Sequence, residues 1–456
     1  MERTEATPAA EEKADPASEV DLSDAPPADQ AGGIAVPEDH SVRNGLLWVP
    51  RVLLFLPRWA LELAFVPLRA VAWAFERLDY VVTIFTDFFF TEDRRFGAYP
   101  TALFETGFGL NIGARVEGND LLGYGEKYRL RAGFGGEFRQ IYQFRFTSGS
   151  LLGDRFNLEL QARYNIAPGR PFYGIGNGDI TEFEAGDPVS DPLGGVAINT
   201  RYRENRLRWG ALLSASAGPF NFRLGHIWQI RTFAQTPSDT ATVLTEAYDQ
   251  SRLVGYAEEL FNVYNELAIT FSTLKPAHPW ISRATPSTGW QITTFAGHTK
   301  GVTDDPSDYI RTGIDIERYI NLAFGDRVLL LRGFIDTTIG TREHIPFDSY
   351  PMLGGGQFLR GYPVDRFRDR VAGQLTAEYM YALNQNLATY LFTDIGRVWE
   401  EPSAMQWQNM RQTYGGGVQF HSLESFVFRF QVAASEEGDL FFVFNINPIQ
   451  QTRARF

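Results

Sequence analysis

Cysteine is absent from the 456 residues, and histidine occurs only six times. Without cysteine, disulfides and thiolate metal sites are excluded. A basic surplus is also lacking, because 55 Asp and Glu outnumber 42 Lys and Arg and give a net charge of -13. Nucleic acid is therefore not an expected partner, since no excess positive charge is available to neutralise phosphates.

Motifs of enzymes are missing as well. The sequence has no GxSxG elbow, P-loop or HExxH, and its histidines are scattered at positions 40, 226, 278, 298, 344 and 421. We therefore predict that the protein is not an enzyme and uses no cofactor or metal. One alternative stays open: a lipid-hydrolysing barrel would need a histidine on its lipid side, and His226 is the candidate.

Long uncharged hydrophobic runs, the mark of membrane helices, do not occur. In "LLWVPRVLLFLPRWALELAFVPLRAVAWAFERLDYVV", no uncharged stretch approaches the roughly 18 residues that a spanning helix needs. Pro50, Pro57 and Pro67 divide it into short amphipathic helices. We expect residues 44–96 to lie flat on a membrane, although helices packed on a soluble core would show a similar pattern. The predicted interfacial residues are Trp48, Arg51, Arg58, Trp59, Arg69 and Trp73.

Residues 1–43 hold eleven acidic and three basic residues, a net charge of 3 - 11 = -8. Their Ala, Pro and acidic composition predicts a disordered tail. The tail lacks the apolar core of a signal peptide, so an exported protein would have lost its signal before Met1. We expect this tail to meet an unknown periplasmic partner.

From about residue 98, apolar and polar residues alternate. "RFNLELQARY", "RLRWGALLSA" and "SFVFRFQVAA" each place large apolar side chains on one face and Arg, Gln or Glu on the other. Such repetition is typical of a transmembrane β-barrel, in which apolar residues face lipid and polar residues face a wet lumen. Because the polar half masks the apolar half in any average, a mean hydropathy of -0.21 fits this class.

The alternation predicts an all-β fold: a 16-stranded antiparallel transmembrane β-barrel preceded by short amphipathic helices. The expected strands are 98–106, 108–118, 125–135, 138–148, 155–165, 197–216, 219–232, 262–273, 287–297, 308–320, 327–338, 370–383, 386–399, 412–420, 424–434 and 439–447. Most long connectors (166–196, 233–261 and 339–369) follow odd-numbered strands. One end of the barrel should therefore carry the long loops, as in outer-membrane barrels.

The third long connector ends in "LGGGQFLRGYPVDRFRD", residues 353–369, which mixes charges with large apolar residues. Its "LRGY", the later "LTAEYMYAL" and "LFTDIGRVW", and "FYGIGN" at 172–177 occur in an informative order. Together they resemble the bacterial surface-antigen barrel of the BamA/TamA-type outer-membrane insertase superfamily. The resemblance covers about residues 97–456.

This resemblance implies that the sixth long-side loop folds back into the lumen. The matching loop residues are Arg360, Gly361 and Tyr362, and the arginine would pair with Glu378 and Asp394 on the twelfth and thirteenth strands. Strand alternation agrees, because it places Glu378 on the polar face and puts Asp394 on one face with two supporting residues, Phe392 and Gly396. An ordinary lumenal charge lattice, with the RGY tripeptide a chance turn, is the simpler alternative.

Relatives usually carry periplasmic POTRA modules, whereas residues 1–96 show no βααββ pattern. We therefore expect a POTRA-less member with a tail (1–43), interfacial helices (44–96) and a barrel (97–456) in the bacterial outer membrane. The resemblance implies membrane-protein assembly, protein insertion or membrane remodelling through a lateral seam, which Gly107, Gly109 and Gly113 would weaken. Outer-membrane lipids and client proteins are the expected partners. A solute or protein-translocating pore plugged by the sixth loop is the main alternative.

Overall fold

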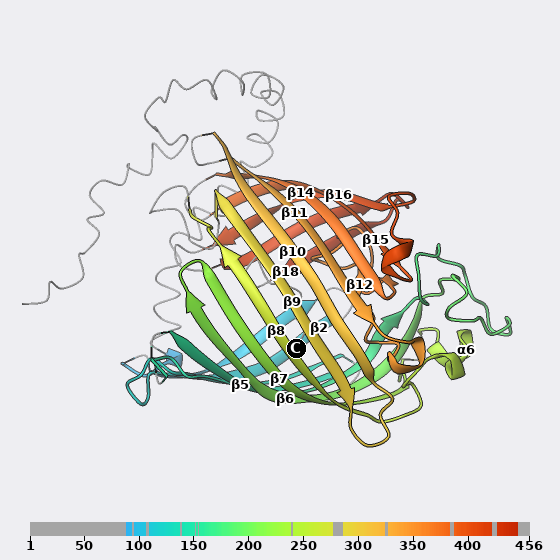
Figure 1. Cartoon of the computed structure of the whole chain (residues 1–456), viewed down its shortest axis with the longest axis horizontal. Coiled ribbons are helices and arrows are strands. Elements are labelled where there is room, and N and C mark those ends of the chain that lie inside the picture. Colours follow the sequence, from blue (N-terminus) through green and yellow to red (C-terminus); the bar gives the residue numbers. More distant parts are fainter. Residues whose placement is uncertain are drawn as a thin grey trace, which may run out of the picture.

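The structure is a computed structural model that describes residues 88–93, 95–105, 109–136, 139–150, 152–153, 155–238, 240–276, 286–323, 327–383, 387–421 and 426–445. In these residues, 16 strands form one antiparallel sheet in chain order (Figure 1). The sheet curves round, so that its first strands are seen behind β8 and β9 (Figure 1). The predicted all-β fold with 16 antiparallel strands is confirmed.

The strands of the first half are β1 (Phe96–Glu105), β2 (Gly109–Asn119), β3 (Lys127–Gly135), β4 (Arg139–Thr147), β5 (Phe156–Phe172), β6 (Thr200–Ala217), β7 (Phe220–Gln235) and β8 (Leu260–Ser272). Those of the second half are β9 (Gly289–Gly301), β10 (Asp308–Ala323), β11 (Arg327–Ile339), β14 (Val371–Ala382), β15 (Leu387–Trp399), β16 (Arg411–His421), β17 (Phe426–Ser435) and β18 (Leu440–Asn445). Each predicted strand has its counterpart.

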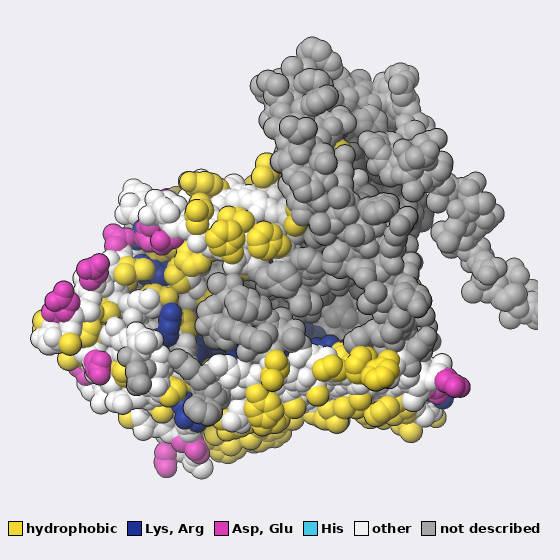
Figure 2. Space-filling model, turned by 180° about the vertical axis from the view of Figure 1, so that it is seen from behind, with side chains coloured by type: hydrophobic (Ala, Val, Ile, Leu, Met, Phe, Trp, Pro, Cys, Tyr) yellow, Lys and Arg dark blue, Asp and Glu magenta, His cyan; other side chains and the backbone are white. Residues whose placement is uncertain are grey.

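Alternation along each strand separates an apolar outer face from a polar inner face. In β5, Phe156, Leu160 and Tyr164 are exposed, whereas Arg163 and its neighbours of the same parity point inward. Hydrophobic side chains gather on the outer surface accordingly (Figure 2). The period of two in the sequence therefore assigns each residue to one face.

The largest difference from the predicted boundaries is in β5, which continues to Phe172, past the expected end at residue 165. A register shift between Ala167 and Arg170 lets the strand pass Pro168 and still pair with β6. Such a bulge absorbs residues that cannot join the ladder. The extra length brings the FYGIGN segment to the long-loop end of the sheet.

Long connectors follow β5, β7 and β11, whereas Gly218 and Pro219 alone join β6 to β7. The connector after β7 holds helix α6 (Leu244–Ala247) and the 3₁₀ helix η4 (Gln250–Arg252). The connector after β11 holds η5 (Arg342–His344) and a separate two-stranded sheet of β12 (Met352–Leu353) and β13 (Phe367–Arg368). A further 3₁₀ helix, η6 (Pro402–Ala404), follows β15.

The tail and most of the proposed interfacial helices, residues 1–87, lie outside the described residues. In the part that is described, no helix is long and apolar enough to cross a membrane. Gly107 also lies outside this part, but β1 pairs with β2 without a shift from Phe96 to Glu105. Gly109 and Gly113 therefore lie within an unbroken ladder, and the weaker pairing expected of them stays a prediction. A Cβ on Gly113 would lie 2.2 Å from the Ala132 carbonyl oxygen, so this glycine permits close packing of β2 on β3.

Candidate functional site

The connector between β11 and β14, here called the sixth loop (340–370), packs against the inner face of the sheet. Its apolar residues Leu359, Tyr362 and Phe367 are each at most 1% exposed. They form one cluster with loop residues Leu353 and Phe358 and with sheet residues Phe334, Ala372 and Val398. The large apolar residues among the loop's charges thus pack against the inner wall.

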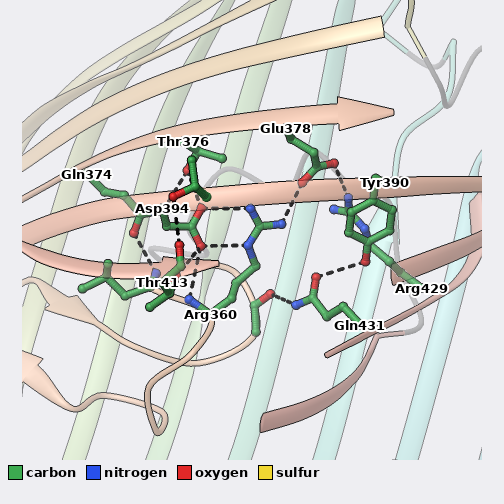
Figure 3. Close-up of polar contacts among 12 residues, drawn as sticks. Arg360, Gln374, Thr376, Glu378, Tyr390, Asp394, Thr413, Arg429 and Gln431 are labelled. Carbon is green, nitrogen blue, oxygen red and sulfur yellow. Dashed lines mark hydrogen bonds and ion pairs between the residues drawn. The ribbon is translucent and has the colours of Figure 1, made fainter. Parts of the chain in front are cut away.

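Arg360 lies between the two carboxylates that the resemblance indicated (Figure 3). Its Nε and Nη2 donate to the two oxygens of Asp394 over 2.9 Å each, and its Nη1 donates to Glu378 over 2.7 Å. The Arg360 backbone N–H also donates to Asp394, over 3.2 Å. This planar, bidentate arrangement matches a guanidinium and could not be reproduced by a lysine.

A second arginine, Arg429 on β17, completes the charge balance. It forms an ion pair with the other oxygen of Glu378, so two arginines face two carboxylates. Arg360 stacks over the Phe392 ring at 3.4 Å, and Arg429 over the Tyr390 ring at 3.7 Å. Arg429 was not among the predicted site residues, although its place on the polar face of "SFVFRFQVAA" was a usable signal.

Neutral polar groups occupy the remaining positions around these charges. Thr376 and Thr413 donate to Asp394 over 2.8 and 3.2 Å. Gln374 accepts the backbone N–H of Leu359, and Gln431 donates to the carbonyl of Gly356 (Figure 3). The loop backbone is therefore hydrogen-bonded to the wall on both sides of Arg360.

The supporting positions have distinct geometries. A Cβ on Gly361 would lie 2.4 Å from the carbonyl oxygen of Ala434, so only glycine fits where the loop crosses β17. A Cβ on Gly396 would lie 3.0 Å from the Gly373 oxygen and 3.3 Å from Leu353 of the loop. The Tyr362 hydroxyl donates to Glu436. Burial, and then the charge of Glu436, raises the pKa of Tyr362 above its usual value.

Two more ion-pair clusters attach the sixth loop to the first half of the sheet. Asp348 accepts hydrogen bonds from Arg231 at 2.6 Å and from Arg206 at 2.9 Å. Asp365 accepts one from Arg170 at 2.8 Å. Sequence alternation placed Arg206 on the polar face, but it could not pair this arginine with an acid over a hundred residues away.

The FYGIGN segment bridges the loop and β15. The Asn177 side chain makes two hydrogen bonds with the backbone of Val398, of 2.7 and 3.1 Å. The Gly176 N–H donates to the carbonyl of Arg368, and Arg366 donates to that of Gly178. The FYGIGN segment is therefore hydrogen-bonded both to β15 and to the sixth loop.

The inner face of β2–β7 is strongly basic. Three glutamates, Glu117, Glu159 and Glu204, share it with eleven arginines. These are Arg115, Arg129, Arg131, Arg139, Arg145, Arg163, Arg170, Arg206, Arg208, Arg223 and Arg231. Arg115 lies opposite Arg131, and Arg163 opposite Arg208, where like charges repel.

Three other candidate sites are His226, a possible metal site and the interfacial residues. His226 points outward from β7, and its direct neighbours across the strands are Ala211 and Asn265. Among the residues described, no group of three or more His, Cys, Asp or Glu gathers as for a metal ion. The interfacial residues Trp48, Arg51, Arg58, Trp59, Arg69 and Trp73 lie outside those residues, so their role stays a prediction.

Residues 282–447, which contain β9–β18 and the whole Arg360 site, match a family model. That model describes the Omp85 superfamily domain. No curated protein matches the chain in sequence.

Solved structures are similar to this chain over 76 to 77% of its length. BamA from Haemophilus ducreyi lacking POTRA domains 1–3 is 13% identical with a TM-score of 0.55, over 77% of this chain and 69% of that one. CdiB from Acinetobacter baumannii is 10% identical with a TM-score of 0.46, over 77% of this chain and 59% of that one. CdiB from Escherichia coli is 10% identical with a TM-score of 0.48, over 76% and 61%. The BamA likeness supports the barrel fold around the Omp85 domain.

Proposed function

We propose that this chain is a bacterial outer-membrane barrel that assists insertion of other outer-membrane proteins, or remodels the membrane, at the seam between β1 and β18. The first and last strands of the sheet carry the proposal. In the described residues, neighbouring strands of the sheet share hydrogen-bonded ladders, whereas no ladder joins β1 to β18. A seam without long ladder pairing can open at lower cost than the long pairings within the sheet.

The outer face supports placement in a membrane. Leu224, Leu375 and Leu391 are each about half exposed, at 55, 47 and 48%. Exposed apolar side chains on strand after strand are stable only when they face lipid. Omp85 barrels such as BamA are bacterial outer-membrane proteins, and the proposal extends this location, with lipids and client barrels as partners, to this chain. The acidic tail would meet a periplasmic partner.

The sixth loop gives the barrel a rigid wall beside the seam. Arg360 joins the loop to β14 and β15, and Arg429 joins β14 to β17, the neighbour of β18. These contacts fix the strands behind the seam while leaving β18 itself outside the network. Opening would therefore be confined to β18 and β1.

Reconstitution tests the proposal. We expect vesicles of phosphatidylethanolamine and phosphatidylglycerol that contain the purified chain to accelerate folding of a urea-unfolded outer-membrane barrel, measured by gel mobility. Cysteine pairs scanned between Phe96–Glu105 and Leu440–Asn445 should abolish the acceleration when oxidised, and reductant should restore it.

A disulfide between the cross-strand partners Leu160 and Ala211, far from the seam in the strand order, is the matched control. It should leave the acceleration unchanged. Equal folding rates in empty and loaded vesicles would contradict the insertion function, whereas acceleration that survives a locked seam would contradict the seam alone.

The basic inner wall favours a second candidate, a solute or protein-translocating pore plugged by the sixth loop. Eleven inward arginines on β2–β7 would attract anions into a water-filled lumen. Planar-bilayer recordings should then show small conductance that rises in Arg360→Ala, with an anion preference that falls in Arg163→Gln/Arg208→Gln. Equal, unselective conductance in the parent protein, in Arg360→Ala and in Arg163→Gln/Arg208→Gln would rule out the pore.

A further inference from the structure

A small cavity lies between the inner wall and the sixth loop, away from the Arg360 site. It measures about 80 Å³ and lies against β6, β7 and β10 and against two residues of the sixth loop. Its charged lining consists of Arg206, Arg208, Arg231, Arg311 and Asp348. Four guanidiniums and one carboxylate therefore surround a single space.

Three of these four arginines are held by a carboxylate. Arg206 and Arg231 both donate to Asp348, over 2.9 and 2.6 Å. Arg311 donates to Asp336 over 3.0 and 2.6 Å. Their charges are thus balanced, at least in part, by neighbouring acids.

Arg208 differs from the other three. Within the part of the chain that the structure describes, it forms neither a hydrogen bond nor an ion pair. Its direct neighbours across the strands are Arg163 on β5 and Gln229 on β7, and neither supplies a negative charge. A guanidinium that faces another guanidinium is repelled by it. The positive charge of Arg208 therefore needs an anion from outside the described residues.

Hydrogen-bond donors are also in surplus around the cavity. Arg231 is only 2% exposed, yet its Nε and Nη2 make no hydrogen bond among the described residues, and neither does the Nε of Arg206. Buried polar groups almost always have a partner, and an exception often indicates an ion or a water molecule. Both the charge and the donors at this cavity call for an acceptor.

We propose that the cavity binds a free phosphate ion, held mainly by Arg208. A guanidinium pairs with phosphate through parallel hydrogen bonds. One water-sized group needs about 15 Å³ of such space, so a cavity of about 80 Å³ has room for roughly five, enough for a phosphate. A phosphate presents oxygens on every side, which suits arginines that approach from β6, β7 and β10 better than the planar oxygens of a carboxylate do.

The site would couple an anion to the attachment of the sixth loop. Asp348 and Ser349 line the cavity from the loop, whereas the arginines line it from the strands. The cavity is complete only while the loop packs on the wall. A ligand that binds only this state stabilises it by mass action, so phosphate would hold the sixth loop in place. This inference goes beyond the proposed function, because it concerns a ligand of the barrel and not its clients.

Binding and its effect on the loop are measured on the purified full chain in detergent. Inorganic phosphate should show a broadened phosphorus NMR line in the presence of the chain. Protease cleavage within 340–370 should slow about tenfold at ten times the dissociation constant, compared with sodium chloride of equal ionic strength.

Two variants locate the site. Arg208→Gln should fold like the parent protein, because it breaks no hydrogen bond or ion pair, and should lose both the broadening and the protection. Arg115→Gln, on the same face but four strands away on β2, is the matched control and should keep both.

Three results would overturn the site. One is equal cleavage in phosphate and in chloride. The second is an equal loss of binding in Arg208→Gln and Arg115→Gln, which would mean diffuse attraction along the basic wall. The third is equal protection by acetate or by glycerol 3-phosphate, which would assign the cavity to a carboxylate or to a phosphate ester instead of the free ion.

Discussion

Arg360 and Asp394 are joined by two parallel hydrogen bonds, from Nε to Oδ2 and from Nη2 to Oδ1, each 2.9 Å long. Both side chains are almost fully buried, at 5 and 0% exposure. A buried ion pair of this kind offsets its desolvation only when every partner is present. The attachment of the sixth loop therefore depends on a few specific atoms.

Arg360→Ala should release the sixth loop. The change leaves Asp394 without its cation and Glu378 with Arg429 alone, at a cost of roughly 3–5 kcal/mol in unfolding free energy. We expect a lower urea midpoint and faster protease cleavage within 340–370. Arg360→Lys should recover only part of the stability, because an ammonium cannot form the bidentate pair.

Gln357→Ala is the matched control, since Gln357 is an exposed residue of the same loop. It should behave like the parent protein. Equal cleavage of Arg360→Ala and Gln357→Ala would show that the arginine does not hold the loop.

Glu378→Gln should be rescued by Arg429→Met. Glu378 accepts from both arginines, so its neutralisation leaves Arg429 buried beside Tyr390 without a charge partner. Removing that second charge should then restore stability. A double-mutant cycle in urea should give a coupling of about 1–3 kcal/mol. Additive effects would mean that the two residues act independently.

The strands were predictable because their signal is local. A period of two assigns each residue to one face, so Glu378 and Asp394 could be placed inward from the sequence. The apolar residues Leu359, Tyr362 and Phe367 among the loop's charges were a usable signal of their burial. The resemblance supplied the pairing of Arg360 with both carboxylates.

Long-range pairings were not predictable, because they depend on strand stagger. Direct cross-strand pairing leads from Glu378 on β14 to Phe392, then to Gly415, and on β17 to Ala433. Ala433 is four residues from Arg429 along that strand. Only the tilt of the strands and the length of two side chains bring Arg429 to Glu378. The glycines of β16 contribute: a Cβ on Gly415 or Gly417 would lie 2.7 Å from Phe392 or 2.6 Å from Tyr390, the rings on which the arginines stack.

Gly361→Ala should displace the loop without removing a charge. Its Cβ would meet the backbone of β17 at 2.4 Å, and backbone cannot rotate away. We expect a loss of about 1–3 kcal/mol, typical of overpacking, together with faster cleavage of the sixth loop. Gly136→Ala, whose Cβ would meet nothing within 4 Å, should have no effect. If Gly361→Ala and Gly136→Ala had the same stability and cleavage rate, the close approach of the sixth loop to β17 would be contradicted.

Alkaline pH should loosen the loop through Tyr362. Burial and the charge of Glu436 raise the pKa of Tyr362 in the folded protein. In the unfolded chain the pKa of a tyrosine is about 10. Below that pH both states are protonated and the contribution is complete. Above it the unfolded state loses its proton first, so stability falls as pH rises toward the folded pKa, by up to about 1.4 kcal/mol per pH unit. Urea midpoints between pH 8 and 11 should therefore fall more steeply in the parent protein than in Tyr362→Phe, which keeps the ring against Phe367. All other tyrosines titrate alike in both proteins, so parallel curves would mean that Tyr362 ionises as easily in the folded loop as in water.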